Sequence, residues 1–292
     1  MNVTIFTPTY NREKLLDRLY RSLLQQTDRN FEWLIVDDGS TDGTEQYFES
    51  ILKNDNPFAI IYKKQENGGK HRAINSGVKM AHGELFFIVD SDDYLLPDAI
   101  EKIRQWRSTL NHSKKWAGVA GLRGYTKDTC VGGRYGKQAY VDATNLERDK
   151  YSLFGDKAEA YFTEVLAQYP FPEFPGEKFI TEEVVWNAIA ADGYKLRWFN
   201  DIIYICDYLD GGLTKSGNAK YIDSPNGTLL WAKQTISLFP KNRRRKISAI
   251  YRYYVAVNGR KTENEIAFDL GISRLKLRLI RFAYKMRKII KK

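Results

Sequence analysis

Five apolar residues run directly into a cluster of acids in the stretch Leu85-Phe86-Phe87-Ile88-Val89-Asp90-Ser91-Asp92-Asp93. A short, continuously apolar run of this kind is typical of a strand that is buried on both faces of a sheet. The neighbouring carboxylates repel one another, so the strand end that carries them needs a source of positive charge. The stretch therefore predicts a buried strand over 85–89 that ends at a functional edge of a sheet.

Strand-like and helix-like segments alternate around this stretch. Apolar runs predict strands over residues 3–7, 33–36, 59–62 and 85–89. Apolar spacing and capping signals predict helices over residues 11–26, 42–53, 73–81 and 97–106. Strands that alternate with helices in this way indicate a mostly parallel sheet flanked by helices, so the fold class is α/β.

Each predicted strand borders a polar segment. These segments are Thr7-Pro8-Thr9-Tyr10-Asn11-Arg12, Asp37-Asp38-Gly39-Ser40-Thr41-Asp42, Asn67-Gly68-Gly69-Lys70-His71-Arg72 and Asp90-Ser91-Asp92-Asp93. One such segment alone is as easily a turn or a helix cap. Ligands of open α/β sheets bind beyond the carboxyl ends of the strands, so four segments at one edge predict a binding site. The acids predict a hard divalent cation there, because such ions prefer oxygen ligands and often share diphosphate oxygens.

The four segments resemble the motifs of the family 2 glycosyltransferases, which have the GT-A fold, and among them the bacterial enzymes of capsule and surface-polysaccharide synthesis. The resemblance covers residues 1–100 and thins beyond residue 110 to an acidic segment near Glu182. It implies an inverting glycosyltransferase that moves a sugar from a nucleotide-diphosphate sugar, expected to be a UDP-sugar, to an acceptor hydroxyl. The acceptor would be a saccharide or a lipid-linked saccharide, and the cofactor would be Mn²⁺ or Mg²⁺.

The resemblance also assigns roles to individual residues. The nucleotide pocket would be lined by Thr7, Pro8, Tyr10 and Arg12. Asp38 would contact the base of the nucleotide, and Lys70 would lie near the diphosphate. The segment Asp90-Ser91-Asp92 corresponds to the family's DxD motif. Within it, Asp90 would lie near the ribose, Ser91 would contribute to donor binding, and Asp92 would bind the metal.

Inversion in a single displacement also needs a base for the acceptor hydroxyl. In family members an acidic pair, often Glu-Asp, supplies it at the start of a later helix. Glu182 and Glu183 occupy that place here, at a predicted helix start over 181–186. Glu183 replaces the usual Asp, so either carboxylate is a candidate, with Glu182 favoured. Two acids at a helix N-terminus are also favourable without any catalytic role.

The chain is expected to divide into three parts. These are a nucleotide-sugar-binding half of the GT-A domain over 1–110, an acceptor-binding and catalytic-base half over 111–215, and a helical, basic extension over 216–292. Within the second part, the Gly-rich stretch 118–136 predicts a mobile loop, and 196–199 and 202–206 predict two strands. Cys130 and Cys206 are too few and too far apart for a disulfide framework or a zinc site, which favours a reducing compartment.

The extension differs from the rest of the chain in charge. From Lys241 onward there are 17 Lys and Arg residues and three acids, a net charge of +14, whereas residues 1–240 carry −4. Apolar residues at helical spacing form a predicted stripe of Leu275, Leu279, Phe282, Ala283, Met286, Ile289 and Ile290. A basic amphipathic helix over 274–292 fits the surface of an anionic bilayer. The stripe could equally pack on the catalytic body or pair with another copy in a homo-oligomer.

Other features narrow the location and the rival functions. The N-terminus lacks the pattern of a signal peptide, and no stretch approaches the roughly 20 apolar residues of a transmembrane helix. We therefore expect a cytoplasmic protein, peripheral at the inner face of the membrane. The basic pI of about 9.3 raises a nucleic-acid-binding protein as an alternative, but no nucleic-acid motif is present, and the acids would repel phosphates without a metal. A sugar nucleotidyltransferase is the second alternative. A dinucleotide-dependent oxidoreductase is not supported, because no Gly-x-Gly-x-x-Gly motif follows the first strand.

Overall fold

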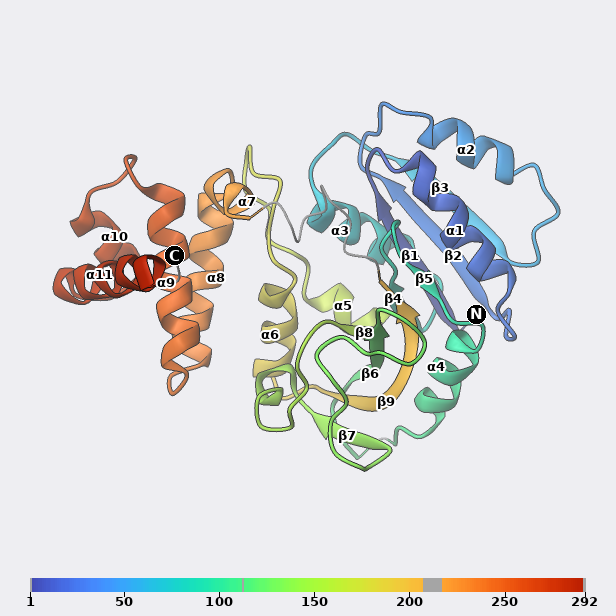
Figure 1. Cartoon of the computed structure of the whole chain (residues 1–292). Helices are drawn as coiled ribbons and strands as arrows, with labels where there is room; N and C mark the ends of the chain where they lie inside the picture. Colours follow the sequence, from blue (N-terminus) through green and yellow to red (C-terminus); the bar gives the residue numbers. More distant parts are fainter. Residues whose placement is uncertain (1, 112, 207–216, 291–292) are drawn as a thin grey trace. The chain divides into compact units, whose positions relative to one another are not determined.

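The computed structural model describes residues 2–111, 113–206 and 217–290, with side chains up to Tyr284. Within these residues the chain forms two compact units. The sheet unit comprises residues 1–171 and 185–209, and the helical unit comprises residues 172–184 and 210–292 (Figure 1). The chain therefore passes from one unit to the other three times.

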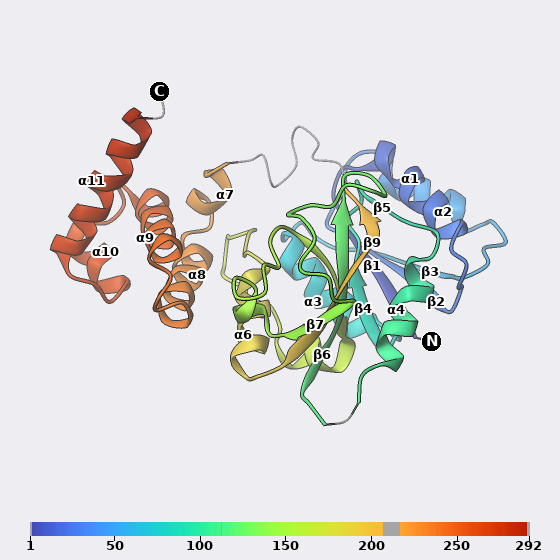
Figure 2. The same ribbon diagram turned by 60° about the horizontal axis from the view of Figure 1, so that its bottom comes forward.

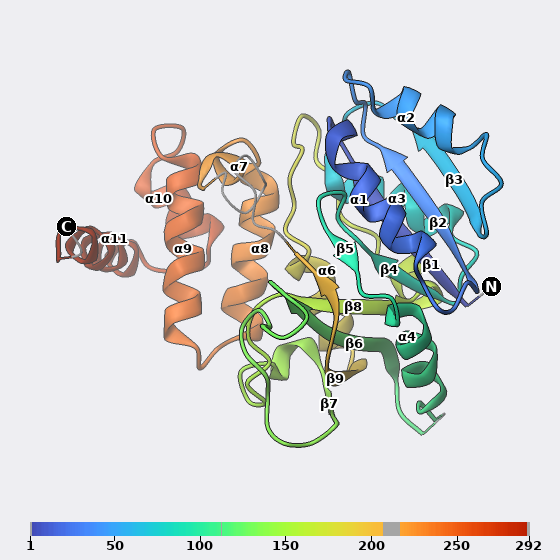
Figure 3. The same cartoon turned by 45° about the vertical axis from the view of Figure 1, so that its right-hand side comes forward.

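The sheet unit is built on a nine-stranded sheet with the order β3-β2-β1-β4-β8-β6-β9-β5, in which β7 also pairs with β9. The strands are β1 (Val3–Thr9), β2 (Phe31–Asp37), β3 (Ala59–Lys64), β4 (Leu85–Ile88), β5 (Tyr94–Leu95), β6 (Trp116–Gly124), β7 (Tyr140–Ala143), β8 (Lys157–Phe162) and β9 (Lys195–Ile205). The first four in sequence pair in parallel, which confirms the strands predicted around residues 3–7, 33–36, 59–62 and 85–89. Strand β8 runs antiparallel to both of its neighbours, so the sheet is mixed (Figure 3).

Helices lie against both faces of the parallel strands. The helices of the sheet unit are α1 (Glu13–Leu24), α2 (Thr44–Ile51), α3 (Lys70–Met80), α4 (Ala99–Ser108), α5 (Thr163–Gln168) and all but the start of α6 (Glu183–Ala191). On one face, the ring of Trp33 in β2 stacks with Tyr20 of α1 and meets Phe48 of α2 edge-on. On the other face, Phe6 of β1 lies against Gly77 of α3. The α/β sandwich predicted from the sequence is confirmed.

The second half of the sheet differs from the sequence prediction in two places. The stretch 118–136 was expected to be a mobile loop, but β6 occupies 116–124 and is almost entirely buried. The two strands expected over 196–199 and 202–206 form the single strand β9, which pairs with β6 through an irregular register (Figure 2). Asn200 lies between the two predicted strands, and its side-chain amide donates to the carbonyl oxygens of Tyr135 and Gln138.

A glycine in β6 allows the close approach of β8. Gly118 has a φ of 146°, and a Cβ added there would lie 2.0 Å from the carbonyl oxygen of Ala160 in β8. A second glycine of β6 also serves packing, since a Cβ at Gly121 would meet the ring of Trp106 in α4.

We expect Gly118→Ala to destabilise the protein by about 1–3 kcal/mol or more, because the methyl group meets backbone that cannot move aside. Gly193→Ala is the matched control, since Gly193 also has a positive φ (84°) but open space around it. Urea unfolding of the two variants separates the steric clash from the cost of the backbone conformation. Equal losses of stability in both variants would contradict this packing role.

The helical unit contains the basic extension. Its helices are α7 (Ala219–Ile222), α8 (Pro225–Leu238), α9 (Arg243–Val257), α10 (Glu263–Asp269) and α11 (Arg274–Ile290). Helices α8 and α9 pack side by side, and α11 contacts both α9 and α10 (Figure 1). The helical character predicted for this part is confirmed. Among the described residues, no helix combines the length and the apolar character that a membrane crossing requires.

Candidate active site

Four polar loops meet at the carboxyl edge of the parallel strands. In the register of the sheet, Thr9 of β1 pairs with Asp37 of β2, and Asp37 pairs with Lys64 of β3. Phe6 of β1 pairs with Ile88, the last residue of β4. The loops that follow these strands therefore leave the sheet at neighbouring positions. The structure brings together the four segments that the sequence singled out.

The first two loops are joined by hydrogen bonds through Asn11. This residue has a positive φ of 53°, a conformation that asparagine tolerates better than most residues. Its backbone N–H donates to Oγ of Ser40 (2.8 Å), and its side-chain oxygen accepts from the N–H of Thr41 (2.8 Å). The loop that carries Tyr10 and Arg12 is thereby fixed to the loop that follows Asp38.

Asp38 fixes the third loop. Its buried carboxylate accepts hydrogen bonds from the backbone N–H groups of Gly68 (2.9 Å) and Gly69 (2.7 Å) and from the side chain of Gln65 (2.9 Å). Gly39 has a φ of 83°, and a Cβ there would lie 2.9 Å from the backbone nitrogen of Asn67. Asp38 thus forms part of the wall of the site, while its predicted contact with a nucleotide base stays a prediction.

The carboxylate of Asp90 is neutralised by the protein. Lys70, the first residue of α3, places Nζ 2.6 Å from Oδ1 of Asp90, and Arg123 of β6 places Nη1 3.4 Å from Oδ2. Burial alone would raise the pKa of Asp90, but the two cations outweigh burial and hold that pKa well below its usual range. Lys70 was predicted to lie near a diphosphate, and the structure places it beside the acidic segment.

Asp93 is held by a different partner. The hydroxyl of Tyr204 in β9 donates to Oδ2 of Asp93 (2.6 Å) and accepts from the backbone N–H of Asp90 (3.0 Å). The guanidinium of Arg123 lies 4.2 Å from the centre of the Tyr204 ring and 3.9 Å from Asp93. Burial and the nearby charge of Asp90 raise the pKa of Asp93 to about 7. One tyrosine and one arginine therefore hold both ends of the acidic segment.

Asp92 lies between these two acids and is partly exposed. Burial and the charge of Asp90 raise its pKa, and the positive charges of Arg12 and Lys70 act in the opposite direction. Within the described residues, the Asp92 carboxylate forms no ion pair. The guanidinium of Arg18 in α1 donates a hydrogen bond to the backbone carbonyl oxygen of Asp92 and so ties the acidic segment to α1.

These contacts decide which acid fits a metal ion. The sequence suggested that the acids of this segment gather a cation together, but Asp90 and Asp93 already have partners within the protein. Among the described residues, no three His, Cys, Asp or Glu side chains are grouped to hold a metal. A divalent ion that takes one or two carboxylates and fills its shell with diphosphate oxygens and water needs only Asp92. The residues present fit such an ion.

The other predicted donor residues occupy different environments. Thr7 is fully buried, and its hydroxyl accepts a hydrogen bond from the indole of Trp33, so its side chain belongs to the core. Tyr10 is 47% exposed, whereas Ser91 is buried. Pro8 and Arg12 are partly exposed. Their contacts with a donor stay predictions.

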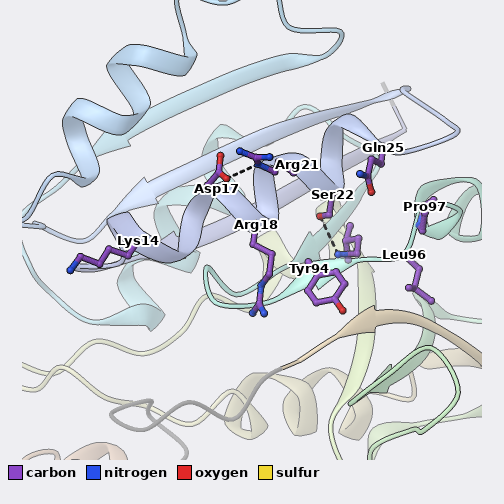
Figure 4. A pocket seen from close by; sticks show the side chains of 10 residues that line it. Lys14, Asp17, Arg18, Arg21, Ser22, Gln25, Tyr94, Leu96 and Pro97 are labelled. Carbon is purple, nitrogen blue, oxygen red and sulfur yellow. Dashed lines mark hydrogen bonds and ion pairs between the residues drawn. The ribbon is translucent and has the colours of Figure 1, made fainter.

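A groove of about 440 Å³ adjoins the acidic segment (Figure 4). It lies between α1 and the chain at 94–97, and its lining includes Arg18, Arg21 and Tyr94. The guanidinium of Arg18 lies 5.1 Å from the centre of the Tyr94 ring, and Arg21 is paired with Asp17 at 2.6 Å. The groove gives the acidic segment a basic neighbour on its α1 side.

The predicted base residues belong to the helical unit. The Glu183 carboxylate accepts from the indole N–H of Trp231 (2.7 Å) and forms an ion pair with Arg245 (2.5 Å). Glu182 precedes the first turn of α6 and is partly exposed. The other predicted site residues lie in the sheet unit.

Sequence reasoning missed Arg123 and Tyr204. They lie in β6 and β9, in a region that carries no recognisable motif, and only the pairing order of the sheet brings them to the end of β4. An arginine in a buried strand is the one signal that could have suggested a buried acidic partner.

We expect Tyr204→Phe to cost about 1–3 kcal/mol of stability, because it leaves the buried Asp93 carboxyl and the Asp90 N–H without their partner. Tyr135→Phe is the control, since the hydroxyl of that buried tyrosine has no hydrogen-bond partner among the described residues. Thermal unfolding of the two variants measures the difference. A Tyr204→Phe protein as stable as the Tyr135→Phe protein would show that Tyr204 does not hold the segment.

The sheet order, the loops and the acidic segment define an α/β protein of the GT-A fold class. Residues 4–112 match the description "Glycosyl transferase family 2". This matched segment contains the four polar segments that resemble the family in sequence. The glycosyltransferase GlyG of Streptococcus pneumoniae serotype 4 is 35% identical over 103 residues, which cover 35% of this chain and 34% of that protein. The match thus spans about a third of the curated relative.

Solved structures are similar over most of the chain. One is TarS 1–349 of S. aureus in complex with UDP-GlcNAc, which has 21% sequence identity and a TM-score of 0.66, with 98% of this chain and 92% of that chain covered. Another is the mannosyltransferase PcManGT of Pyrobaculum calidifontis in complex with GDP-Man and Mn²⁺, with 18% identity, a TM-score of 0.57 and coverage of 89% and 76%. At these identities the likeness establishes the fold, including the helices that follow the sheet.

Proposed function

We propose that this chain is an inverting glycosyltransferase that moves a sugar from a nucleotide-diphosphate sugar to an acceptor hydroxyl. The observation that carries the proposal is that the three acids of the acidic segment have different partners. Asp90 is paired with Lys70 and Arg123, and Asp93 is held by the hydroxyl of Tyr204, which leaves Asp92 as the carboxylate available to a ligand. This arrangement lies at the strand ends where α/β sheets bind nucleotides, within the segment that matches family 2.

The donor is proposed to be a UDP-sugar bound by the four loops. Pro8, Tyr10 and Arg12 would line the nucleotide pocket, and Asp90 would lie near the ribose. The solved TarS structure contains UDP-GlcNAc and the PcManGT structure contains GDP-Man, so this fold accommodates nucleotide sugars in those proteins. The positive charges of Arg12 and Lys70 near Asp92 suit a diphosphate.

Asp92 would hold the cofactor, Mn²⁺ or Mg²⁺. A bound divalent ion neutralises charge on the diphosphate as it leaves the sugar. The residues of the chain hold the backbone of the segment: Arg18 donates to the carbonyl oxygen of Asp92, and Tyr204 accepts from the N–H of Asp90. Lys70 and Arg123 keep Asp90 ionised and balance its charge, so that Asp92 is the acid whose charge is available to the proposed ion.

We propose Glu182 as the base and give Glu183 a structural role. A base must take a proton from the acceptor hydroxyl during the displacement. If Glu183 took that proton, it would lose its ion pair with Arg245, which lies in the same helical unit. Glu182 is partly exposed and lies one residue before the helix, where its carboxylate is accessible to an acceptor.

The acceptor is proposed to be a saccharide or lipid-linked saccharide of a bacterial surface polysaccharide or glycolipid. This rests on the relatives, which include GlyG of S. pneumoniae and, at 35% identity over 100 residues, a putative teichuronic acid biosynthesis glycosyltransferase of Bacillus subtilis.

A donor screen tests the proposal. The purified chain is incubated with UDP-GlcNAc, UDP-glucose, UDP-galactose or GDP-mannose, each with Mn²⁺, with Mg²⁺ or with EDTA, and nucleoside diphosphate release is measured. We expect release from one donor class, and at least about 100-fold less with EDTA because the leaving group then lacks its counter-charge. Equal donor binding and release with EDTA would refute the metal. Pyrophosphate formation from a sugar 1-phosphate and a nucleoside triphosphate would instead identify a nucleotidyltransferase.

A further inference from the structure

Four large apolar side chains on the last two helices are exposed to solvent. Phe268 of α10 is 87% exposed, and Leu275, Leu279 and Phe282 of α11 are 68%, 60% and 66% exposed. We call these four residues the tail face: three form one stripe of α11, and Phe268 lies on α10, which contacts α11. They are the most exposed large hydrophobic residues in the described part of the chain. Exposed apolar surface of this extent marks a site of interaction in soluble proteins.

The tail face is not the side of α11 that packs within the helical unit. The packed side consists of Leu277 and Ile280, which are buried, and Tyr284, whose ring stacks on Tyr251 of α9 at 3.8 Å. At helical spacing these residues fall opposite the stripe of the tail face. Of the stripe predicted from the sequence, Leu275, Leu279, Phe282 and Ala283 are exposed, and Met286, Ile289 and Ile290 lie outside the described side chains.

A network of ion pairs fixes the rotation of α11. The carboxylate of Glu263, the first residue of α10, accepts from Arg274 (3.0 Å) and Arg278 (2.8 Å) and also pairs with Arg281. One acid therefore ties three bases of α11 to α10. Turning α11 to bury the tail face against α9 would break this network and expose the stacked Tyr284. The outward direction of the tail face is thus built into the unit.

Positive charge surrounds the tail face. Residues 274–292 contain nine Lys and Arg residues and no acid. At helical spacing, Lys276 and Arg278 fall on opposite sides of the exposed stripe, and both are exposed. An apolar stripe with bases on both flanks matches an anionic lipid bilayer. The stripe suits the acyl chains, and the bases suit the anionic headgroups above them.

We propose that the tail face docks the chain on an anionic bilayer, with α11 lying along the surface and the four apolar side chains entering the acyl region. The charge favours this occupant over a second copy of the chain. Two tail faces packed together would bring the positively charged α11 helices of two copies close to each other, whereas anionic headgroups neutralise them. The proposal needs no donor, metal or acceptor, so it stands or falls separately from the proposed function.

Vesicle co-sedimentation of the full chain tests the proposal. The vesicles are phosphatidylcholine alone, or phosphatidylcholine with a third of phosphatidylglycerol. The test variant is Phe268→Gln/Leu279→Gln/Phe282→Gln, and the control is Leu52→Gln/Phe154→Gln, which removes exposed apolar side chains (45% and 51% exposed) from the sheet unit. We expect wild type and control to bind the anionic vesicles, and the test variant to bind at least about tenfold more weakly. High salt should also weaken binding.

Three outcomes would overturn the proposal. One is equal binding of the test variant and the control to anionic vesicles. Another is equal binding of wild type to neutral and anionic vesicles, which would remove the role of the bases. The third is a wild-type dimer, seen by light scattering, that the test variant dissociates while neither protein binds vesicles, which would assign the tail face to a second copy. Unchanged thermal unfolding of the test variant shows that a loss of binding is not a loss of folding.

Discussion

Replacing Asp92 by Asn is expected to lower the rate of donor turnover by about 10³-fold, or about 4 kcal/mol in the activation free energy. The substitution keeps the size and hydrogen-bonding shape of the side chain but removes the negative charge. In the proposed site this charge belongs to the one acid of the segment that has no ion pair within the described residues. Nucleoside diphosphate release at saturating donor, over a range of Mn²⁺ concentrations, measures the effect.

Asp93→Asn is the matched control for this prediction. An Asn at 93 can still accept the hydrogen bond of Tyr204, and the pKa of Asp93, raised to about 7, means that this acid is already partly neutral near neutral pH. We therefore expect a less than tenfold change in turnover, in line with a conservative change outside the reacting groups. Similar losses in the two variants would assign the metal to the segment as a whole and contradict the special position of Asp92.

Most of the parallel half of the fold could be predicted because short stretches of sequence determine its strands and helices. Each strand over 1–90 is a short apolar run, and each helix between strands carries its own spacing or capping signals. The order of such elements leaves few arrangements, since parallel strands need crossover helices on one face or the other. The polar loops then fall at one edge of the sheet, which is why the motif residues could be grouped from sequence alone.

The second half of the sheet could not be predicted in the same way. Gly118 suggests a loop by its residue type, and only the approach of Ala160 explains why a glycine is required inside β6. Arg123 and Tyr204 are unremarkable in sequence, and their role depends on the pairing of β6 and β9 with β8 and β5. Contacts between residues that lie 33 and 111 positions apart have no signature in a local pattern.

In the acidic segment, contacts that are distant in sequence decide which carboxylate is available to a ligand. Mutual repulsion of carboxylates correctly implied that positive charge must be nearby, but not that two of the three acids obtain their partners from the protein. The number of acids in a motif is therefore a poor guide to the number of carboxylates that lack a partner within the protein. Burial and the identity of each neighbour decide which carboxylate remains available.

Replacing Glu182 by Gln is expected to reduce transfer by about 10²–10⁴-fold while leaving donor affinity unchanged, because an amide cannot take the proton of the acceptor hydroxyl. Donor affinity is measured by calorimetry with Mn²⁺, and transfer by nucleoside diphosphate release with the donor that the screen identifies. Binding and turnover must be separated, since a loss of both would point to a role in donor binding instead.

Glu183→Gln distinguishes the two neighbouring acids. A Gln at 183 can still accept from the indole of Trp231, but it loses the charge that pairs with Arg245. We therefore expect a loss of stability of about 1 kcal/mol, as for a partly exposed ion pair, with turnover within about fivefold of wild type. The reverse pattern, in which Glu183→Gln abolishes turnover and Glu182→Gln is active, would make the ion-paired residue the base. Arg245 would then have to release Glu183 during each catalytic cycle, and Arg245→Met should raise the activity rather than lower the stability alone.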